Sequence, residues 1–261
     1  MRRPPHALVA ALAFVAAGTL GGCATDESPA AAPTTSAAPT LGTDPTQNIS
    51  TAHDYFAALA TNDVDELAKA VDLSASGSVA ARYATYKLDA AQALEDTGEA
   101  ADPDLLNESA PGEYSICVDS STCIAYREIV LSDGKVSSFS VAGTNIAKLV
   151  GVGNGEAAPL GDLGTVEFLS RYENKRNDLL VLNLKVTSAD EPLTLANDTA
   201  NYRTAEGEQY APVHVVGETA LPANSSVTVT LVYDKATAPG ALDYDVSADG
   251  GKDEGITLRV R

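Results

Sequence analysis

The apolar spacing of this chain changes from a helical period to a strand period partway along its length, and this change limits the folds that it can adopt. Between Ile49 and Leu94 the apolar residues recur every three or four positions, the spacing of one side of an α-helix. From Glu113 onward they alternate with polar residues, the spacing of a half-buried strand. Helices followed by antiparallel strands predict an α+β N-terminal domain.

Three helices are predicted in the first region. Asp63 followed by Glu66 is a capping-box signature, which places the start of the second helix just after Asp63. The third helix is expected to follow Ser78, and Gly98 lies just past its end. The apolar residues that define the three stripes are Ala52, Phe56, Leu59 and Ala60, then Val64, Leu67, Ala68 and Val71, then Val79, Tyr83, Tyr86, Ala90 and Leu94.

An antiparallel meander is predicted after these helices, and Asp133-Gly134 is a strong signal for its last hairpin. Helices that precede a meander ending in Leu131-Ser132-Asp133-Gly134-Lys135-Val136 resemble the nuclear-transport-factor-like cone fold, which ketosteroid isomerases, dehydratases and many non-catalytic domains share. The resemblance covers residues 48–142 and implies a cone-like domain, which we place at residues 48–144. A Gly-rich connector is expected at residues 145–164.

Residues 165–261 are strand-like throughout and hold about seven or eight short strands, which is the density of an all-β immunoglobulin-like sandwich. This half resembles the immunoglobulin-like domain of unknown function that occurs in many Gram-positive lipoproteins and is related to a mycobacterial immunoprotective secreted antigen. The resemblance implies packing and turns, but no chemistry. The residues that carry it are Leu180 to Thr187, Glu191-Pro192-Leu193, Tyr202, Glu206 to Tyr210, and Leu221 to Tyr233.

The first residues have the features of an export signal. Arg2 and Arg3 precede an apolar stretch from Ala7 to Ala17, which is shorter than the roughly 20 residues that cross a bilayer. Leu20-Gly21-Gly22-Cys23 resembles the bacterial lipobox, which implies cleavage after residues 1–22 and fatty acyl chains such as palmitate, attached through diacylglycerol on Cys23. The alternative is an ordinary signal peptide that happens to contain a cysteine.

Residues 23–47 are expected to form a lipidated, disordered tether, because Leu41 is their one large apolar residue after the cysteine. Lipid would then hold the folded part at the outer face of the cytoplasmic membrane. The formal net charge is −19, and it falls to −21 without residues 1–22, which contain Arg2 and Arg3 but no acid. Such a charge argues against nucleic acid as a partner and against adhesion to anionic headgroups.

Cys117 and Cys123 are expected to lie on successive strands, facing each other if the hairpin centres on Ser120. An exported chain meets an oxidising environment, so a structural disulfide is the expected pairing. A redox pair or a pair of metal thiolates is the alternative. No other free cysteine and no nearby histidine is available to complete a metal site, so we expect no bound metal.

The chain offers little material for catalysis. No nucleophile elbow or phosphate loop occurs, and we interpret Gly151-Val152-Gly153-Asn154-Gly155 as part of the connector. The alternative to a non-enzymatic protein is a small-molecule enzyme or binder with a pocket in the N-terminal domain. Its polar groups would be His53, Asp54, Tyr83 or Tyr86.

A second alternative is a calcium-dependent binding module, because carboxylates near glycine turns can hold calcium. The acids concerned are Asp243, Asp245, Asp249, Asp253 and Glu254. They do not match the known twelve-residue calcium loop, so a solvated acidic edge is the preferred interpretation. We therefore expect a non-catalytic binding or structural lipoprotein of the cell envelope, with no cofactor, whose partner is a protein or an envelope polymer.

Mass spectrometry of the mature N-terminus tests the predicted anchor. The first residue is expected to be Cys23 carrying diacylglycerol, and a Cys23→Ala variant should leave the membrane fraction, because lipid supplies the attachment. An unacylated N-terminus at any other residue would contradict the prediction.

Overall fold

The computed structural model describes residues 45–248 and 250–261, which form three helices and mostly antiparallel sheets. The predicted signal, the lipidation of Cys23 and most of the predicted tether lie outside the described residues. The first helix begins at Pro45, three residues before the expected domain start at Asn48. Proline is tolerated there because the first helical N–H groups have no intrahelical partner. Within the described residues no helix is long and apolar enough to span a bilayer.

The three predicted helices are present. Their bounds are α1 Pro45–Ala60, α2 Val64–Asp72 and α3 Val79–Asp96. The Asp63 side chain accepts a hydrogen bond from the N–H of Glu66 at 3.0 Å and caps α2. Ser78 caps α3 in the same way, and Gly98 adopts a φ of +76° just past its C-terminus. These local signals are what the sequence predicted.

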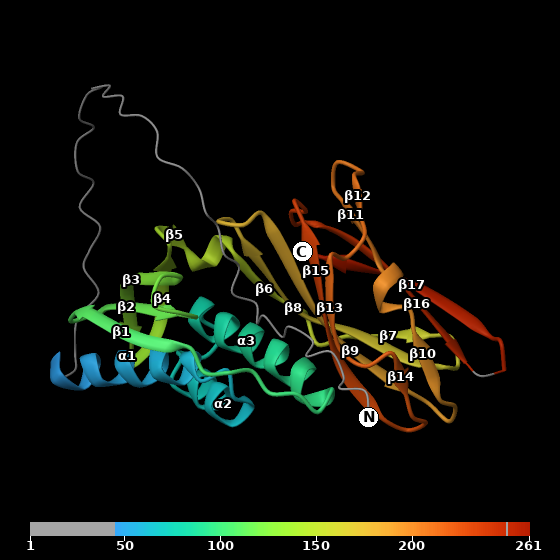
Figure 1. Cartoon of the computed structure of the whole chain (residues 1–261), viewed down its shortest axis with the longest axis horizontal. Helices are drawn as coiled ribbons and strands as arrows, with labels where there is room; N and C mark the ends of the chain where they lie inside the picture. The colour runs from blue at the N-terminus through green and yellow to red at the C-terminus, as the bar shows by residue number, and fades with distance from the viewer. Residues whose placement is uncertain (1–44, 249) are drawn as a thin grey trace, which may run out of the picture.

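A five-stranded antiparallel sheet covers the helices, with its strands in chain order (Figure 1). Asp133 and Gly134 have φ values of +52° and +75°, and they form the turn of the predicted β3–β4 hairpin. Strand β1 was not expected, because its sequence Leu-Leu-Asn-Glu-Ser-Ala lacks strict alternation. The bounds are β1 Leu105–Ala110, β2 Glu113–Cys117, β3 Cys123–Ser132, β4 Lys135–Val141 and β5 Thr144–Asn145.

The predicted disulfide is confirmed. Cys117 and Cys123 are direct partners in the β2–β3 register, and their sulfur atoms lie 2.08 Å apart. The bridge closes the hairpin between two strands of the five-stranded sheet.

The structure corrects the prediction of a connector at residues 145–164. Most of this segment is regular secondary structure. A 3₁₀ turn at Ile146–Lys148 leads into β6 Val150–Val152 and β7 Ala157–Leu160, which both pair with β8 Gly164–Asn174. A Cβ atom on Gly153 would lie 1.8 Å from the carbonyl oxygen of Phe168. The glycine is therefore needed for close backbone approach beside a sheet.

Two facing six-stranded sheets form the C-terminal half, in agreement with the sandwich-like region that was predicted. One has the order β13-β15-β9-β8-β6, with β7 also paired to β8; the other has the order β12-β11-β16-β10-β14, with β17 paired to β16. The remaining bounds are β9 Leu179–Ser188, β10 Leu193–Leu195, β11 Asn201–Thr204, β12 Gln209–Tyr210, β13 His214–Val216, β14 Ala220–Leu221, β15 Ser226–Asp234, β16 Gly240–Ala248 and β17 Asp253–Val260, with a 3₁₀ turn at Asn197–Thr199.

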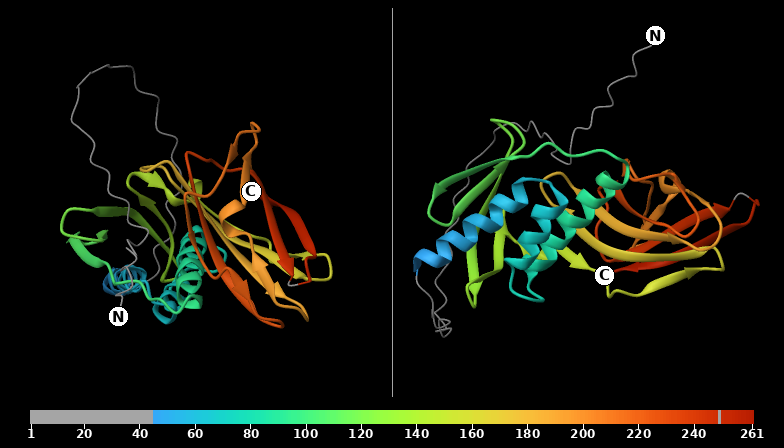
Figure 2. Two further views of the ribbon diagram at one scale, coloured as in Figure 1. Left: turned by 45° about the vertical axis from the view of Figure 1, so that its right-hand side comes forward. Right: turned by 90° about the horizontal axis from the view of Figure 1, so that it is seen from below.

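Helix α3 packs against the outer face of the sheet that contains β8, β9 and β15, so the two halves share this sheet (Figures 1 and 2). Tyr172, Val181 and Val232 on that face belong to the same buried cluster as Tyr83 and Tyr86 of α3. The opposite face of the sheet lines the interior of the sandwich. Strand β9 is consequently buried on both faces, which explains its nearly continuous apolar sequence.

The contact between α3 and this shared sheet is called the joint below. A series of buried, hydrogen-bonded polar side chains crosses it. Ser170, Asn183 and Thr230 are polar side chains with no exposed surface. Thr230 donates to the amide oxygen of Asn183 at 2.7 Å, and the Asn183 amide donates to Ser170 at 3.0 Å. The same amide donates to the backbone oxygen of Tyr86 in α3 at 3.1 Å. Because these buried groups are satisfied only when α3 and the three strands are together, they fix how the helix sits on the sheet.

The polar chain ends at a carboxylate on α3. Ser170 donates a hydrogen bond to Asp89. Asp96, the last residue of α3, accepts a hydrogen bond from the N–H of Thr228 at 2.6 Å. Burial raises the pKa of the Asp89 carboxyl from 3.8 to about 6; the hydrogen bond from Ser170 opposes this rise, and the negative charge of Glu167 adds to it. The folded state therefore holds a proton that the unfolded state releases at lower pH.

We predict that stability conferred by Asp89 is fully present below pH 4 and is lost as the pH rises through about 6. Urea unfolding of the wild type and of Asp89→Asn at several pH values measures this effect as the difference between the two proteins. That difference should change by up to about 3 kcal/mol in favour of the amide between pH 4 and 7.5, at 1.4 kcal/mol per pKa unit. A difference that does not vary with pH would contradict the prediction.

Candidate functional site

The interior of the N-terminal half is filled by packed aromatic rings. Phe56 stacks on Tyr114 with a centroid separation of 4.9 Å, and the hydroxyl groups of Tyr83 and Tyr126 lie 3.0 Å apart. Burial raises the pKa of Tyr126 to about 12 and that of Tyr83 well above its ordinary value, so both phenols stay neutral at physiological pH. The rings of this cluster are Tyr55, Phe56, Tyr83, Tyr86, Tyr114, Tyr126, Phe139 and Tyr172.

The polar groups considered for an N-terminal pocket are not brought together. His53 and Asp54 are exposed to solvent on α1, and the His53 imidazole lies 3.5 Å from the carboxylate of Glu108. Tyr83 and Tyr86 are instead buried in the aromatic cluster. The structure therefore separates the histidine and aspartate from the two tyrosines.

Two of the acidic residues near the C-terminus, Asp243 and Glu254, have side-chain partners in the described structure. Asp243 accepts a hydrogen bond from Thr257 at 2.6 Å and lies 3.8 Å from Arg203. Glu254 lies 3.6 Å from the Lys252 ammonium. Asp249 lies outside the described residues, and the rest of the described chain contains no group of three or more potential metal ligands.

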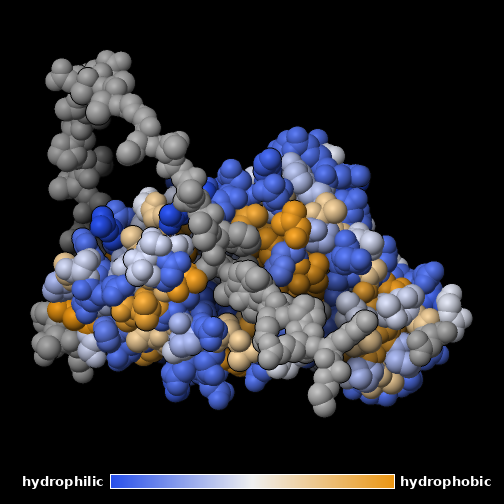
Figure 3. All heavy atoms as spheres, viewed as in Figure 1, coloured by the Kyte–Doolittle hydropathy of each residue, from blue (hydrophilic) through white to orange (hydrophobic). Residues whose placement is uncertain are grey.

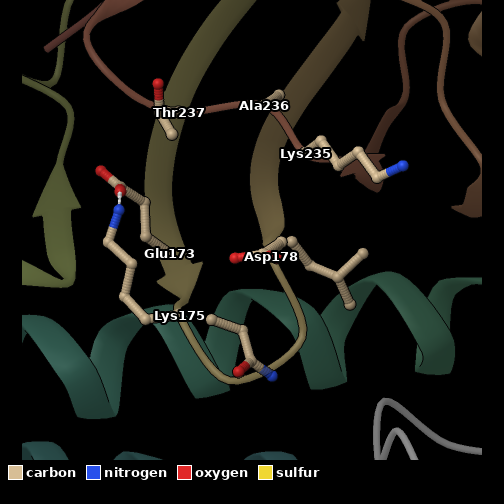
Figure 4. Close-up of a pocket in the computed structure, with 8 residues that line it drawn as sticks. Glu173, Lys175, Asp178, Lys235, Ala236 and Thr237 are labelled. Atoms are coloured by element: carbon tan, nitrogen blue, oxygen red, sulfur yellow. Dashed lines mark hydrogen bonds and ion pairs between the residues drawn. The ribbon is translucent and has the colours of Figure 1, made fainter.

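A polar cleft opens where two turns meet at one end of the shared sheet (Figure 4). One turn joins β8 to β9, and the other joins β15 to β16. The cleft has a volume of about 270 Å³. Its lining residues are Glu173, Asn174, Lys175, Asp178, Leu179, Lys235, Ala236 and Thr237.

Glu173 forms one wall of this cleft and is a buried residue, 6% exposed, with two cationic partners. Its carboxylate accepts from the Arg171 guanidinium at 2.9 Å and is bonded to the ammonium of Lys175, whose side chain is half exposed. Arg171 also donates to the backbone oxygen of Arg261, which fastens the end of β17 to the same strand. Because both oxygens of Glu173 already have cationic partners, we assign this carboxylate a structural role.

The opposite wall is built from two residues with left-handed backbones. Asp178 and Lys235 have φ values of +52° and +60°, a conformation that is uncommon for residues other than glycine. The N–H of Lys235 donates to the backbone oxygen of Asp178, which ties the two turns together. Both residues lie in turns, where this conformation reverses the direction of the chain.

The side chains at this wall point in different directions. In Figure 4 a carboxylate oxygen of Asp178 points across the cleft toward the Glu173–Lys175 pair, whereas Lys235 extends away from it. The Lys235 ammonium lies 3.9 Å from Asp234. Next to Asp178, the side-chain oxygen of Asn177 is buried and has no hydrogen-bond partner among the described residues.

The surface around these elements is mainly hydrophilic, and hydrophobic residues gather on the visible face in several separate patches (Figure 3). This distribution agrees with the formal net charge of −19. The exposed large apolar residues are Ile49, Leu105, Val118, Val130, Val152 and Val213.

The sequence contains a partial signal for this cleft that our reading of the residues missed. Arg171 and Glu173 occupy alternate positions of β8, so their side chains share one face of the strand, and Lys175 continues the same alternation just past the end of the strand. A charged triplet on the face that otherwise lines the sandwich interior indicates a buried ion pair. Nothing local predicts that the turn after β15 completes the cleft.

Comparisons with known proteins give distant likenesses only. No protein-family model and no curated protein matches the chain. The crystal structure of the yeast GGA1 GAE domain matches with a TM-score of 0.29 and 16% identity, over 41% of this chain and 97% of that domain. The crystal structure of MPT63, a secreted protein from Mycobacterium tuberculosis, matches with a TM-score of 0.23 and 13% identity, over 60% of this chain and 92% of that protein. Neither likeness carries an inference about function.

Removal of the cation that holds Glu173 should destabilise the protein. Arg171→Met leaves a buried carboxylate with the partly exposed Lys175 as its remaining partner, and we expect a loss of about 3 kcal/mol in the free energy of unfolding. Chemical denaturation measures this loss. The double variant Arg171→Met/Glu173→Gln also removes the buried charge, so it should recover part of the lost free energy of unfolding. A loss below about 0.5 kcal/mol in the single variant would contradict the prediction.

Proposed function

We propose that the chain is a non-catalytic binding lipoprotein of the cell envelope, held at the outer face of the cytoplasmic membrane by lipid on Cys23. Its folded part would combine a cone-like α+β unit with an immunoglobulin-like sandwich of the kind found in exported lipoproteins. The observation that carries the binding role is the polar cleft between the β8–β9 and β15–β16 turns, one wall of which is the buried Glu173 with its partners Arg171 and Lys175.

The arrangement of the remaining polar groups supports binding over catalysis. The aromatic cluster occupies the interior that a cone-fold enzyme would use for its substrate, and its phenols are held neutral. His53 and Asp54 are exposed to solvent on α1, and neither lines the cleft. A general base needs to lie within hydrogen-bond reach of the proton it removes, and neither residue has such a position beside the buried tyrosines.

The joint between the two halves supports a role that depends on rigidity. The β8–β9 turn contacts the disulfide hairpin, because the Arg176 guanidinium donates to the backbone oxygen of Cys123 at 3.1 Å. The cleft is thus braced by both halves of the molecule. A site that is already ordered loses less conformational entropy when a partner binds.

Site-specific photo-crosslinking in the native envelope tests the proposal. A photoreactive residue at Thr237, which is exposed at the cleft, should capture a specific protein or polymer that mass spectrometry can identify. The matched control is Thr219, an exposed residue directly before β14 that does not line the cleft and should not capture the same partner. Equal yields at both positions, or no product at Thr237, would contradict a binding role for the cleft.

A further inference from the structure

The N-terminal and C-terminal parts of helix α3 are held by different interactions. Four of its five buried residues lie before residue 89 and belong to the hydrophobic core around the aromatic cluster. From residue 89 to the last helical residue, Ala93 is the one buried residue, and the others are partly or fully exposed. We call residues 89–96 the latch. A segment that buries so little apolar surface opens at a lower cost in free energy than the core.

Two carboxylates fasten the latch to the shared sheet. Asp89 accepts a hydrogen bond from Ser170 of β8, and Asp96 accepts one from the N–H of Thr228 in β15 at 2.6 Å. Strand β13 pairs with residues 230–232 of β15 and does not extend to Thr228. The Asp96 carboxylate therefore satisfies an N–H of β15 where β13 does not pair with it.

The charges around the latch oppose its docking. Glu95 and Asp96 lie in the last turn of α3, which contains no basic residue, so they lie at the negative end of the helix dipole. Burial raises the pKa of Asp89 to about 6, and the negative charge of Glu167 in β8 adds to this rise. Ionisation of Asp89 therefore places a second negative charge near Glu167 in a partly buried contact.

Other charged groups on the elements around α3 are exposed, paired or distant. Lys87 of α3 is bonded to the turn between α1 and α2 at 2.7 Å. β6 has no charged residue, and the one charged residue of β15 is Asp234, at the opposite end of the strand from Thr228. The lysines of β4, the 3₁₀ turn at Ile146–Lys148 and β9 are exposed, and the remaining bases of β8 and α2 have acidic partners on the same element. These bases are Lys135, Lys148, Lys185, Arg171 and Lys69.

We propose that the latch is a pH-sensitive device, which is docked on the shared sheet in acid and undocks as the pH rises towards neutrality, while the rest of α3 stays in place. The neutral Asp89 carboxyl adds no charge beside Glu167. The docked form is therefore most stable below about pH 4 and loses stability as the pH rises through about 6. Undocking leaves the N–H of Thr228 without its acceptor. No residue of the cleft takes part, so the device is independent of the proposed binding function.

Native-state hydrogen exchange followed by mass spectrometry tests the latch in the full folded protein. After correction for the intrinsic exchange rate at each pH, the protection of amides 90–96 should fall about tenfold between pH 5 and 7.5. Linkage gives this factor for a carboxyl whose pKa changes from about 6 to 3.8 on undocking. Amides 82–88, in the same helix, should change by less than about twofold.

Two variants separate the latch from a general effect of pH. Asp89→Asn should make the protection of amides 90–96 independent of pH, because the amide does not titrate. The matched control Glu95→Gln removes a charge from an exposed residue of the latch and should keep the tenfold change. A tenfold change that persists in Asp89→Asn, or an equal change in amides 82–88 and 90–96 of the wild type, would overturn the proposal.

Discussion

The burial of helix α3 between two sheets is the constraint on which the rest of this structure depends. One side of the helix packs in the aromatic cluster beneath the five-stranded sheet, and the other side meets the face of the sandwich. Three fully buried polar residues, Ser170, Asn183 and Thr230, cross that contact and are satisfied by one another and by α3. An apolar face alone would tolerate sliding of the helix, whereas this hydrogen-bonded chain specifies one position.

The geometry of the cleft depends on this joint. Strands β8 and β9 carry Ser170 and Asn183 in their middle and the cleft turn at their end, so the position of α3 and the shape of the turn are coupled through the same strands. Arg176 then connects that turn to the hairpin closed by Cys117 and Cys123. A partner bound at the cleft would therefore contact a site that both halves of the chain hold in place.

Sequence reasoning succeeded where the determining interactions are local and failed where they join distant segments. Asp63, Ser78 and Asp133-Gly134 marked helix starts and a turn because capping and turn chemistry act over a few residues. The strands at residues 145–164 were missed because glycines that permit close pairing resemble a linker. The joint and the cleft were missed because Asp89, Asn183 and the turn at Lys235 come together only in the tertiary fold.

Differential scanning calorimetry of the mature protein and of Asn183→Ala tests most directly whether the two halves form one cooperative unit. Removing the amide leaves Ser170 and Thr230 without their shared partner at the joint. If the shared sheet and the polar chain unite the halves, the wild type should unfold in a single transition with equal calorimetric and van't Hoff enthalpies. The variant should unfold in one transition at a lower temperature. Two separate transitions in the wild type, or a variant that destabilises one half and leaves the other unchanged, would contradict the account.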